Sequence, residues 1–120
     1  MSEKFGPDKR VRKRSEFLKI KKEGACAAGK YLRVWRLWDD EGGGSRLGVI
    51  VGKRVARAAS ARSLWKRRLR EVFRRSQQES QGRAAILVQP RIAAESPSYG
   101  TLKTEYRQLG RKLGFIKREE

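Results

Sequence analysis

Side chains able to perform acid–base or nucleophilic chemistry are scarce in this chain. It has no histidine, a single cysteine (Cys26) and one dense group of acids, Asp39, Asp40 and Glu41. Without histidine, the commonest general base and metal ligand is missing. The three acids could hold metal ions for an independent nuclease, but they adjoin glycines 42–44, and such a site needs rigid support. A metal-dependent nuclease is therefore the weakest alternative.

The abundant chemistry of the chain is cationic. Its 120 residues include 31 Lys and Arg against 13 Asp and Glu, a formal net charge of +18. Such self-repulsion favours a polyanionic partner. Nucleic acid is the first candidate and an anionic membrane surface the second, but no apolar run approaches the roughly 20 residues that span a bilayer. The N-terminus also lacks the apolar stretch of a secretory signal.

The densest basic segment, residues 61–75, also carries a regular apolar pattern. Trp65, Leu69, Val72 and Phe73 are spaced i, i+4, i+7 and i+8, which predicts one buried helical stripe. The opposite side collects Ser63, Lys66, Arg67, Arg70 and Arg74, and Arg68 and Arg75 flank it with Glu71. A solvated surface normally mixes the two signs of charge. The imbalance here favours a folded helix that binds a polyanion over a merely solvated face or a disordered tail.

The segment before this helix, residues 52–60, has two open interpretations. Its small residues and its place at a helix N-terminus would let a phosphate backbone approach closely. It could equally be an ordinary connector made of good helix formers.

Residues 15–115 are expected to form one small α+β domain, preceded by a basic flexible arm (1–14) and followed by a short tail (116–120). We predict a helix capped by Ser15 and ending at Gly24, a hairpin of strands 30–38 and 46–55, a helix over 60–77, a buried strand over 84–90 and a helix over 99–113. The order α-β-β-α-β-α indicates helices packed on a small mixed sheet. Cys26 is expected to be buried or half-buried, and a lone thiol fits a reducing cytoplasm.

Three segments in register resemble the protein subunit of bacterial ribonuclease P. They are RVRKRSEFLKIKKEG near the start, RLGVIVGKRV in the second strand and ARSLWKRRLREVFR in the basic helix. The family pattern K-R-x-x-R-E matches Lys66, Arg67, Arg70 and Glu71, and S-K-K corresponds to Gly52, Lys53 and Arg54. The chain departs from the family's R-N-R, which reads Arg62, Ser63, Leu64 here, and residues 51–62 are about one residue longer than usual.

The resemblance implies a non-catalytic RNA-binding subunit with a left-handed βαβ crossover, like a domain of a small-subunit ribosomal protein. The RNA subunit would perform the Mg²⁺-dependent removal of the 5′ leader from precursor tRNA, and the protein alone would bind no cofactor. The partners implied are the catalytic RNA and precursor tRNA, in the cytoplasm, without a membrane or an obligate protein partner. A structural ribosomal protein or general RNA chaperone would have the same composition and remains the alternative.

Two sets of site residues follow from the resemblance. The surface for the catalytic RNA would consist of Lys53, Arg54, Arg62, Lys66, Arg67, Arg70 and Arg74. The cleft for the leader would lie between the first helix and the sheet and would consist of Arg12, Arg14, Phe17, Lys21, Arg33 and Trp35. Lys21 replaces a family aromatic, which shifts that position from stacking toward phosphate contact. Trp35 is assigned to the cleft because Arg33 shares its strand face, whereas core packing is almost as good an explanation for Phe17.

Overall fold

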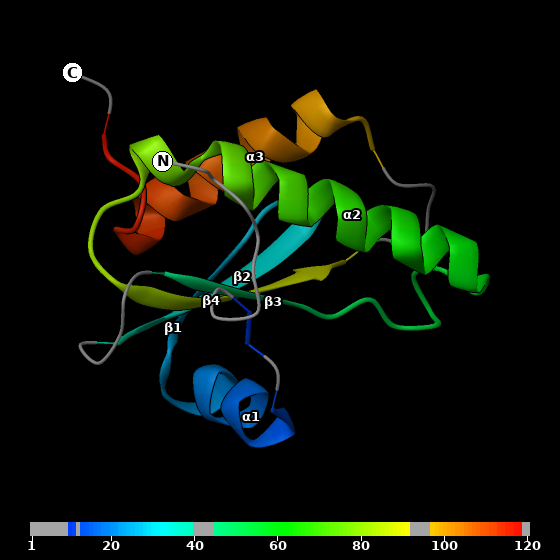
Figure 1. Ribbon diagram of the computed structural model, residues 1–120, viewed down its shortest axis with the longest axis horizontal. Helices are drawn as coiled ribbons and strands as arrows, with labels where there is room; N and C mark the ends of the chain where they lie inside the picture. The colour runs from blue at the N-terminus through cyan, green and yellow to red at the C-terminus, as the bar shows by residue number, and fades with distance from the viewer. Residues whose placement is uncertain (1–9, 12, 40–44, 92–96, 119–120) are drawn as a thin grey trace.

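The computed structural model describes residues 10, 11, 13–39, 45–91 and 97–118, and Figure 1 shows its layers. A four-stranded sheet in the order β1-β2-β4-β3 lies between helix α1 on one face and helices α2 and α3 on the other. The elements are α1 (Arg14–Glu23), β1 (Ala25–Ala28), β2 (Leu32–Trp38), β3 (Arg46–Val49), α2 (Ala59–Arg75), a 3₁₀ turn η2 (Gln77–Glu79), β4 (Ala84–Pro90) and α3 (Tyr99–Leu113). The predicted α+β class with a mixed sheet is confirmed.

The sheet topology corrects the predicted hairpin. Strand β4 lies between β2 and β3, so β2 pairs with β1 and β4 and makes no pair with β3. Strands β3 and β4 run parallel and are joined through α2, as a βαβ crossover requires. The apolar run of β4 is covered on both faces, which suits the centre of the sheet. Strand β1 was not predicted at all.

The main core lies between the sheet and the α2–α3 layer. The four apolar residues predicted as the stripe of α2 are all buried, and Tyr106 of α3 packs its ring on Phe115. Helix α3 has the predicted bounds because it is delimited at both ends. The Ser98 side chain accepts a hydrogen bond from the Thr101 amide, and Gly114 ends the helix in the left-handed conformation (φ 86°) that glycine adopts without strain.

Two polar contacts hold distant segments in place. The Glu105 carboxylate of α3 accepts hydrogen bonds from the amides of Lys30, Tyr31 and Leu32 at 2.6–2.8 Å and so fixes the β1–β2 turn. Arg46 of β3 forms ion pairs with Glu16 of α1 (2.7 Å) and with Asp39 (3.2 Å). The first contact anchors the sheet to α3, and the second anchors it to α1.

Several predicted boundaries differ from the structure. Helix α1 begins at Arg14, and Lys13 is its N-cap residue, so Ser15 lies in the first turn and does not cap the helix. Packing extends beyond 15–115, since Val11 is buried, Arg10 forms a β-bridge with Leu47, and Ile116 is buried. The remainder of the predicted arm, residues 1–9 and 12, lies outside the described residues.

Candidate nucleic-acid interface

A small hollow opens where α1, β3 and α2 meet. It has a volume of about 150 Å³, and we call it the Phe17 hollow. It is lined by Arg10, Val11, Phe17, Leu47, Gly48, Val49 and Arg70. Phe17 is half-buried, so part of its ring packs on the smaller core cluster under α1 and part faces the hollow. Phe17 thus contributes to the core, as one of the two interpretations of the sequence predicted, and still leaves part of its ring open to the hollow.

Gly48 of β3 makes room for the Phe17 ring. A Cβ atom built at Gly48 would lie 2.6 Å from Cε1 of Phe17 and 3.1 Å from Cβ of Val11. Any other residue would therefore push the ring or the strand away. A glycine inside a strand pattern is the sequence signal that could have identified this position, but the partner ring is 31 residues away in the chain.

Trp35 lies deeper than predicted. Its side chain is 8% exposed and belongs to the small cluster under α1 with Ile20 and Leu87. The Lys21 ammonium lies 5.1 Å from the centre of its ring, a cation–π contact. Trp35 therefore acts as the floor beneath α1 and presents little free ring surface.

The remaining predicted cleft residues are distributed around this floor. Arg33 is exposed on the α1 side of the sheet, two residues before Trp35 on the same face, and Arg14 is exposed at the first residue of α1. Arg12 lies outside the described residues. The structure thus brings Phe17, Lys21, Arg33 and Trp35 to the α1 side of the sheet.

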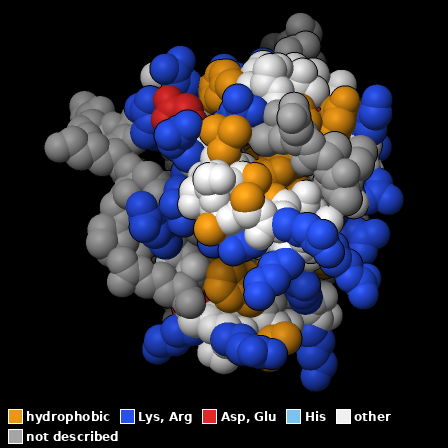
Figure 2. All heavy atoms as spheres, turned by 90° about the vertical axis from the view of Figure 1, so that its right-hand side faces the viewer, with side chains coloured by type: hydrophobic (Ala, Val, Ile, Leu, Met, Phe, Trp, Pro, Cys, Tyr) orange, Lys and Arg blue, Asp and Glu red, His pale blue; other side chains and the backbone are white. Residues whose placement is uncertain are grey.

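Helix α2 and the loop before it carry the predicted basic surface, which we call the α2 ridge: Lys53, Arg54, Arg62, Lys66, Arg67, Arg70 and Arg74. Lys53, Arg54 and Arg67 are exposed, whereas Lys66 and Arg70 are half-buried. Figure 2 shows the side of the molecule where α2 begins, with Lys and Arg covering much of the surface and little acidic surface in view. Positively charged side chains therefore outnumber acidic ones on the described part of this side.

Two members of the α2 ridge are engaged within the protein. The Arg62 guanidinium donates to the carbonyl oxygens of Ala56 (3.0 Å) and Arg57 (2.7 Å) and so closes the loop before α2. This contact supports the connector interpretation of that loop while leaving its exposed cations free to bind phosphate. Arg74 is held by Glu71, as described below.

Arg70 connects the α2 ridge to the Phe17 hollow, because its side chain lines that hollow together with Arg10. Burial, and then the nearby positive charge of Arg10, lower the pKa of Arg70 from its usual value. Two guanidinium groups beside one hollow repel each other, and a bound anion would relieve that repulsion. The hollow is thus suited to a phosphate next to an unstacked base.

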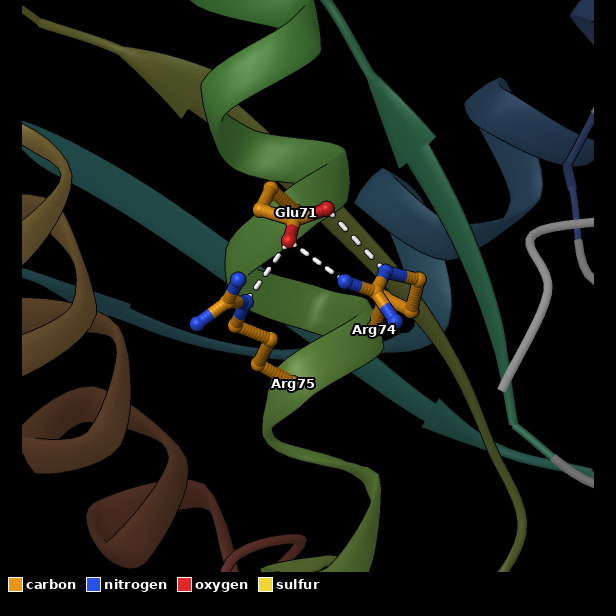
Figure 3. A network of polar contacts seen from close by, with 3 residues as sticks. All are labelled: Glu71, Arg74 and Arg75. Atoms are coloured by element: carbon orange, nitrogen blue, oxygen red, sulfur yellow. Dashed lines mark hydrogen bonds and ion pairs between the residues drawn. The ribbon is translucent and has the colours of Figure 1, made fainter. Parts of the chain in front are cut away.

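Glu71, the acid of the family motif, organises the two arginines that follow it (Figure 3). Its Oε1 accepts from Arg74 Nη2 (2.6 Å) and Arg75 Nε (2.7 Å), and its Oε2 accepts from Arg74 Nε (3.0 Å). The hydrogen bonds from Arg74 first, and then from Arg75, lower the pKa of Glu71 to about 2. The carboxylate therefore stays ionised and orients both guanidinium groups.

The alternative acidic site finds little support among the residues that the structure describes. Asp39 pairs with Arg46, while Asp40 and Glu41 lie outside the described residues. Within the described ranges there is no group of three or more His, Cys, Asp or Glu side chains that could hold a metal ion. No described helix is long and apolar enough to cross a membrane.

Cys26 is exposed, which corrects the expectation of a buried or half-buried thiol. It lies on strand β1 directly opposite Trp35, and directly opposed residues of an antiparallel pair project to the same face. The short strand Ala25–Ala28 sits at the edge of the sheet, where one face stays open.

Comparison with known proteins assigns the chain to a family. The family model described as Ribonuclease P matches residues 5–114. The chain is 30% identical over 100 residues to the ribonuclease P protein component of Pseudanabaena sp., covering 83% of this chain and 86% of the relative. Its fold matches the ribonuclease P protein of Thermotoga maritima with a TM-score of 0.75 at 31% identity, over 85% of this chain and 96% of that one.

A more distant likeness supports the fold alone. The Staphylococcus aureus ribonuclease P protein superimposes with a TM-score of 0.80 at 23% identity, over 91% of this chain and 98% of that one. The match of the family model over most of the chain, together with these relatives, leads to one conclusion: the chain belongs to the family of bacterial ribonuclease P protein components.

Proposed function

We propose that this chain is the protein component of a ribonuclease P holoenzyme and assists removal of the 5′ leader from precursor tRNA. The α2 ridge binds the catalytic RNA, and the α1 side of the sheet binds the leader. The RNA subunit performs the cleavage with Mg²⁺, and no residue of this chain is assigned to a metal or to the bond-breaking step. We place this activity in the cytoplasm. Family membership favours this role over a ribosomal protein or a general chaperone.

The observation that carries the proposal is the meeting of the two surfaces at one hollow. Phe17 of α1 and Arg70 of α2 line the same space, so an RNA strand seated on Phe17 would pass directly beside the α2 ridge. A protein that joins a leader to a catalytic RNA needs such a junction, because the bond at the end of the leader must reach the active site of the catalytic RNA. Surfaces on opposite sides of the molecule would not serve.

The chemistry at each surface suits its ligand. An unstacked base gains about 1–3 kcal/mol by stacking on an aromatic ring, with little dependence on sequence. A shallow hollow with one half-exposed ring therefore tolerates leaders of many sequences. On the α2 ridge, arginine guanidinium groups can bind phosphate oxygens through two parallel hydrogen bonds.

Reconstitution tests the proposal. The protein is added to a bacterial catalytic RNA at a Mg²⁺ concentration too low for the RNA alone, and leader removal is measured in single turnover. We expect the protein to restore cleavage, and its affinity for the RNA to fall steeply with salt as condensed counterions are released. Cleavage of precursor tRNA by the RNA-free protein, or no effect on the catalytic RNA, would overturn the proposal.

A further inference from the structure

A second concave surface lies on the other flank of α2, away from Arg70, where α2 meets the first turn of α3. One hollow of about 370 Å³ is lined by Arg67, Arg68, Glu71, Arg75 and Tyr99. A second, of about 460 Å³, is lined by Arg74, Arg75, Gln78 and Lys103. Arg75 lines both hollows, so they adjoin at this side chain, and we call the pair the α2–α3 groove. None of the described residues that line it lines the Phe17 hollow.

The α2–α3 groove combines an aromatic ring with concentrated positive charge. Tyr99 is half-buried, and its ring centre lies 5.6 Å from the Arg75 guanidinium carbon and 6.0 Å from the Lys103 ammonium nitrogen. Among the described residues that line the groove, Glu71 is the one acid, and Arg74 and Arg75 hold its carboxylate. The described part of the lining therefore has a net positive charge.

The positions of these groups are fixed by packing. Arg68 donates to the Pro97 carbonyl oxygen at 2.8 Å and so joins α2 to the segment before α3. Glu71 accepts a hydrogen bond from the Arg75 guanidinium (Figure 3), and this guanidinium lies near the Tyr99 ring. A solvated basic face would need neither a hollow nor an aromatic ring between cations. The preorganised arrangement is the one that a nucleotide requires, with a flat apolar surface for the base and cations for its phosphate.

We propose that the α2–α3 groove binds an unpaired nucleotide of an RNA strand, with its base against the Tyr99–Arg75 pair and its two flanking phosphates toward Arg67 in one hollow and Lys103 in the other. Hollows of this size fall within the usual range for small ligands, about 300–1,000 Å³. A paired nucleotide would not suit the site, since its base faces are stacked within the helix. The site is a further RNA contact, separate from the leader cleft, and it shares Arg67 and Arg74 with the α2 ridge.

Nuclear magnetic resonance titration of the full chain with the oligonucleotide rU5 tests the proposal directly. We expect two separate sets of shifted signals: the amides of Phe17 and Gly48 at the first hollow, and the amides of Gly100 and Lys103 with the Arg75 Nε–H at the groove. The double variant R75Q/K103Q should lose the second set and keep the first. The control K19Q/K117Q removes the same charge at two exposed lysines and should keep both sets.

The two proposals fail in different ways in this experiment. Shifts confined to Phe17 and Gly48, or groove shifts that persist in R75Q/K103Q, overturn the α2–α3 groove and leave the leader cleft standing. Groove shifts alone overturn the leader cleft, and the absence of both sets overturns both sites.

The source of the nucleotide follows from two further affinity measurements. The nucleotide comes either from the catalytic RNA or from precursor tRNA presented to the holoenzyme. R75Q/K103Q should bind whichever RNA supplies it about tenfold more weakly than the wild type does, which corresponds to the stacking of one base. Its affinity for the other RNA should match that of K19Q/K117Q. Equal affinities of the two variants for both RNAs would contradict a functional groove.

Discussion

The two faces of the sheet are packed in different ways. Toward α2 and α3, the core is filled by large side chains such as Trp65, Phe73 and Tyr106, each about 1% exposed. Toward α1, the cluster is smaller, Phe17 is half-buried, and a hollow remains beside it. The face covered by α2 and α3 therefore provides most of the stability. The face covered by α1 is less completely packed and leaves part of the Phe17 ring accessible. The comparison predicts that substitutions on the two faces have different consequences.

The largest effect is expected from Phe73→Ala in the filled face. Removing a fully buried aromatic ring costs about 3–5 kcal/mol through lost burial and the cavity that remains. Urea unfolding measures this loss, and the RNA affinity of the fraction that stays folded should be nearly unchanged. A loss below about 1 kcal/mol would show that this face is less tightly packed than its burial indicates.

Phe17→Ala, in contrast, should affect RNA binding more than stability. Because the ring is only half-buried, we expect a smaller loss of stability, whereas leader binding should weaken by about 1–3 kcal/mol, the value of one stacked base. The measurement compares the affinity of the holoenzyme for precursor tRNA with its affinity for the same tRNA lacking the leader. The neighbouring Leu18→Ala, at a side chain that is 58% exposed, is the control and should change neither quantity. Equal weakening for both RNAs would contradict a leader contact.

Gly48→Ala sharpens the same comparison without removing the ring. The added Cβ would meet the Phe17 ring at 2.6 Å, so the ring or the strand must move. We expect leader affinity to fall by about 1 kcal/mol, less than in Phe17→Ala, because the stacking surface is displaced and not lost. If Gly48→Ala weakens leader binding in a Phe17→Ala background as much as in the wild type, the two residues act independently and this interpretation is wrong.

The smallest effect is expected from Glu71→Gln, on the α2 surface. The pKa of Glu71 is lowered to about 2, so its contribution to stability is full above its ordinary value of 4.5 and is lost as the pH falls toward 2. Exposed ion pairs contribute about 0.2–1 kcal/mol each, and screening by solvent keeps the effect small. Thermal unfolding of wild type and variant should therefore differ slightly at pH 6 and converge near pH 2. A constant difference across this range would contradict the ion-pair account.

Local patterns in the sequence were sufficient for the elements whose signals lie within a few residues. The stripe of α2, the buried run of β4 and the bounds of α3 follow from periodicity and capping. Strand β1 was missed because ACAA has no β-branched or aromatic residue, and its pairing with β2 depends on the tertiary fold. The predicted hairpin was wrong because β4 lies more than 30 residues beyond β3 in the chain and still inserts between β2 and β3.

The candidate site was only partly accessible to sequence reasoning. Residue type and family resemblance were sufficient to propose Phe17 and the α2 ridge as candidates. They could not show that Trp35 would be nearly covered, that Arg62 would close its own loop, or that Arg10 would lie beside the Phe17 hollow. These features depend on contacts between segments that are adjacent only after folding. Tyr99 and Arg75 likewise lie 24 residues apart in the chain and meet only at the α2–α3 groove.

The central claim is that the α1 side of the sheet binds the leader and the α2 ridge binds the catalytic RNA. Directed cleavage of RNA by tethered Fe–EDTA tests this claim most directly. Cys26 is the single cysteine of the chain and is exposed on the α1 side of the sheet, so it can carry the reagent without a substitution. In the reconstituted complex, we predict cuts in the leader from Cys26. We predict cuts in the catalytic RNA from a reagent placed on α2 by S63C in a C26S background. Leader cuts from the α2 position, with none from Cys26, would contradict the account.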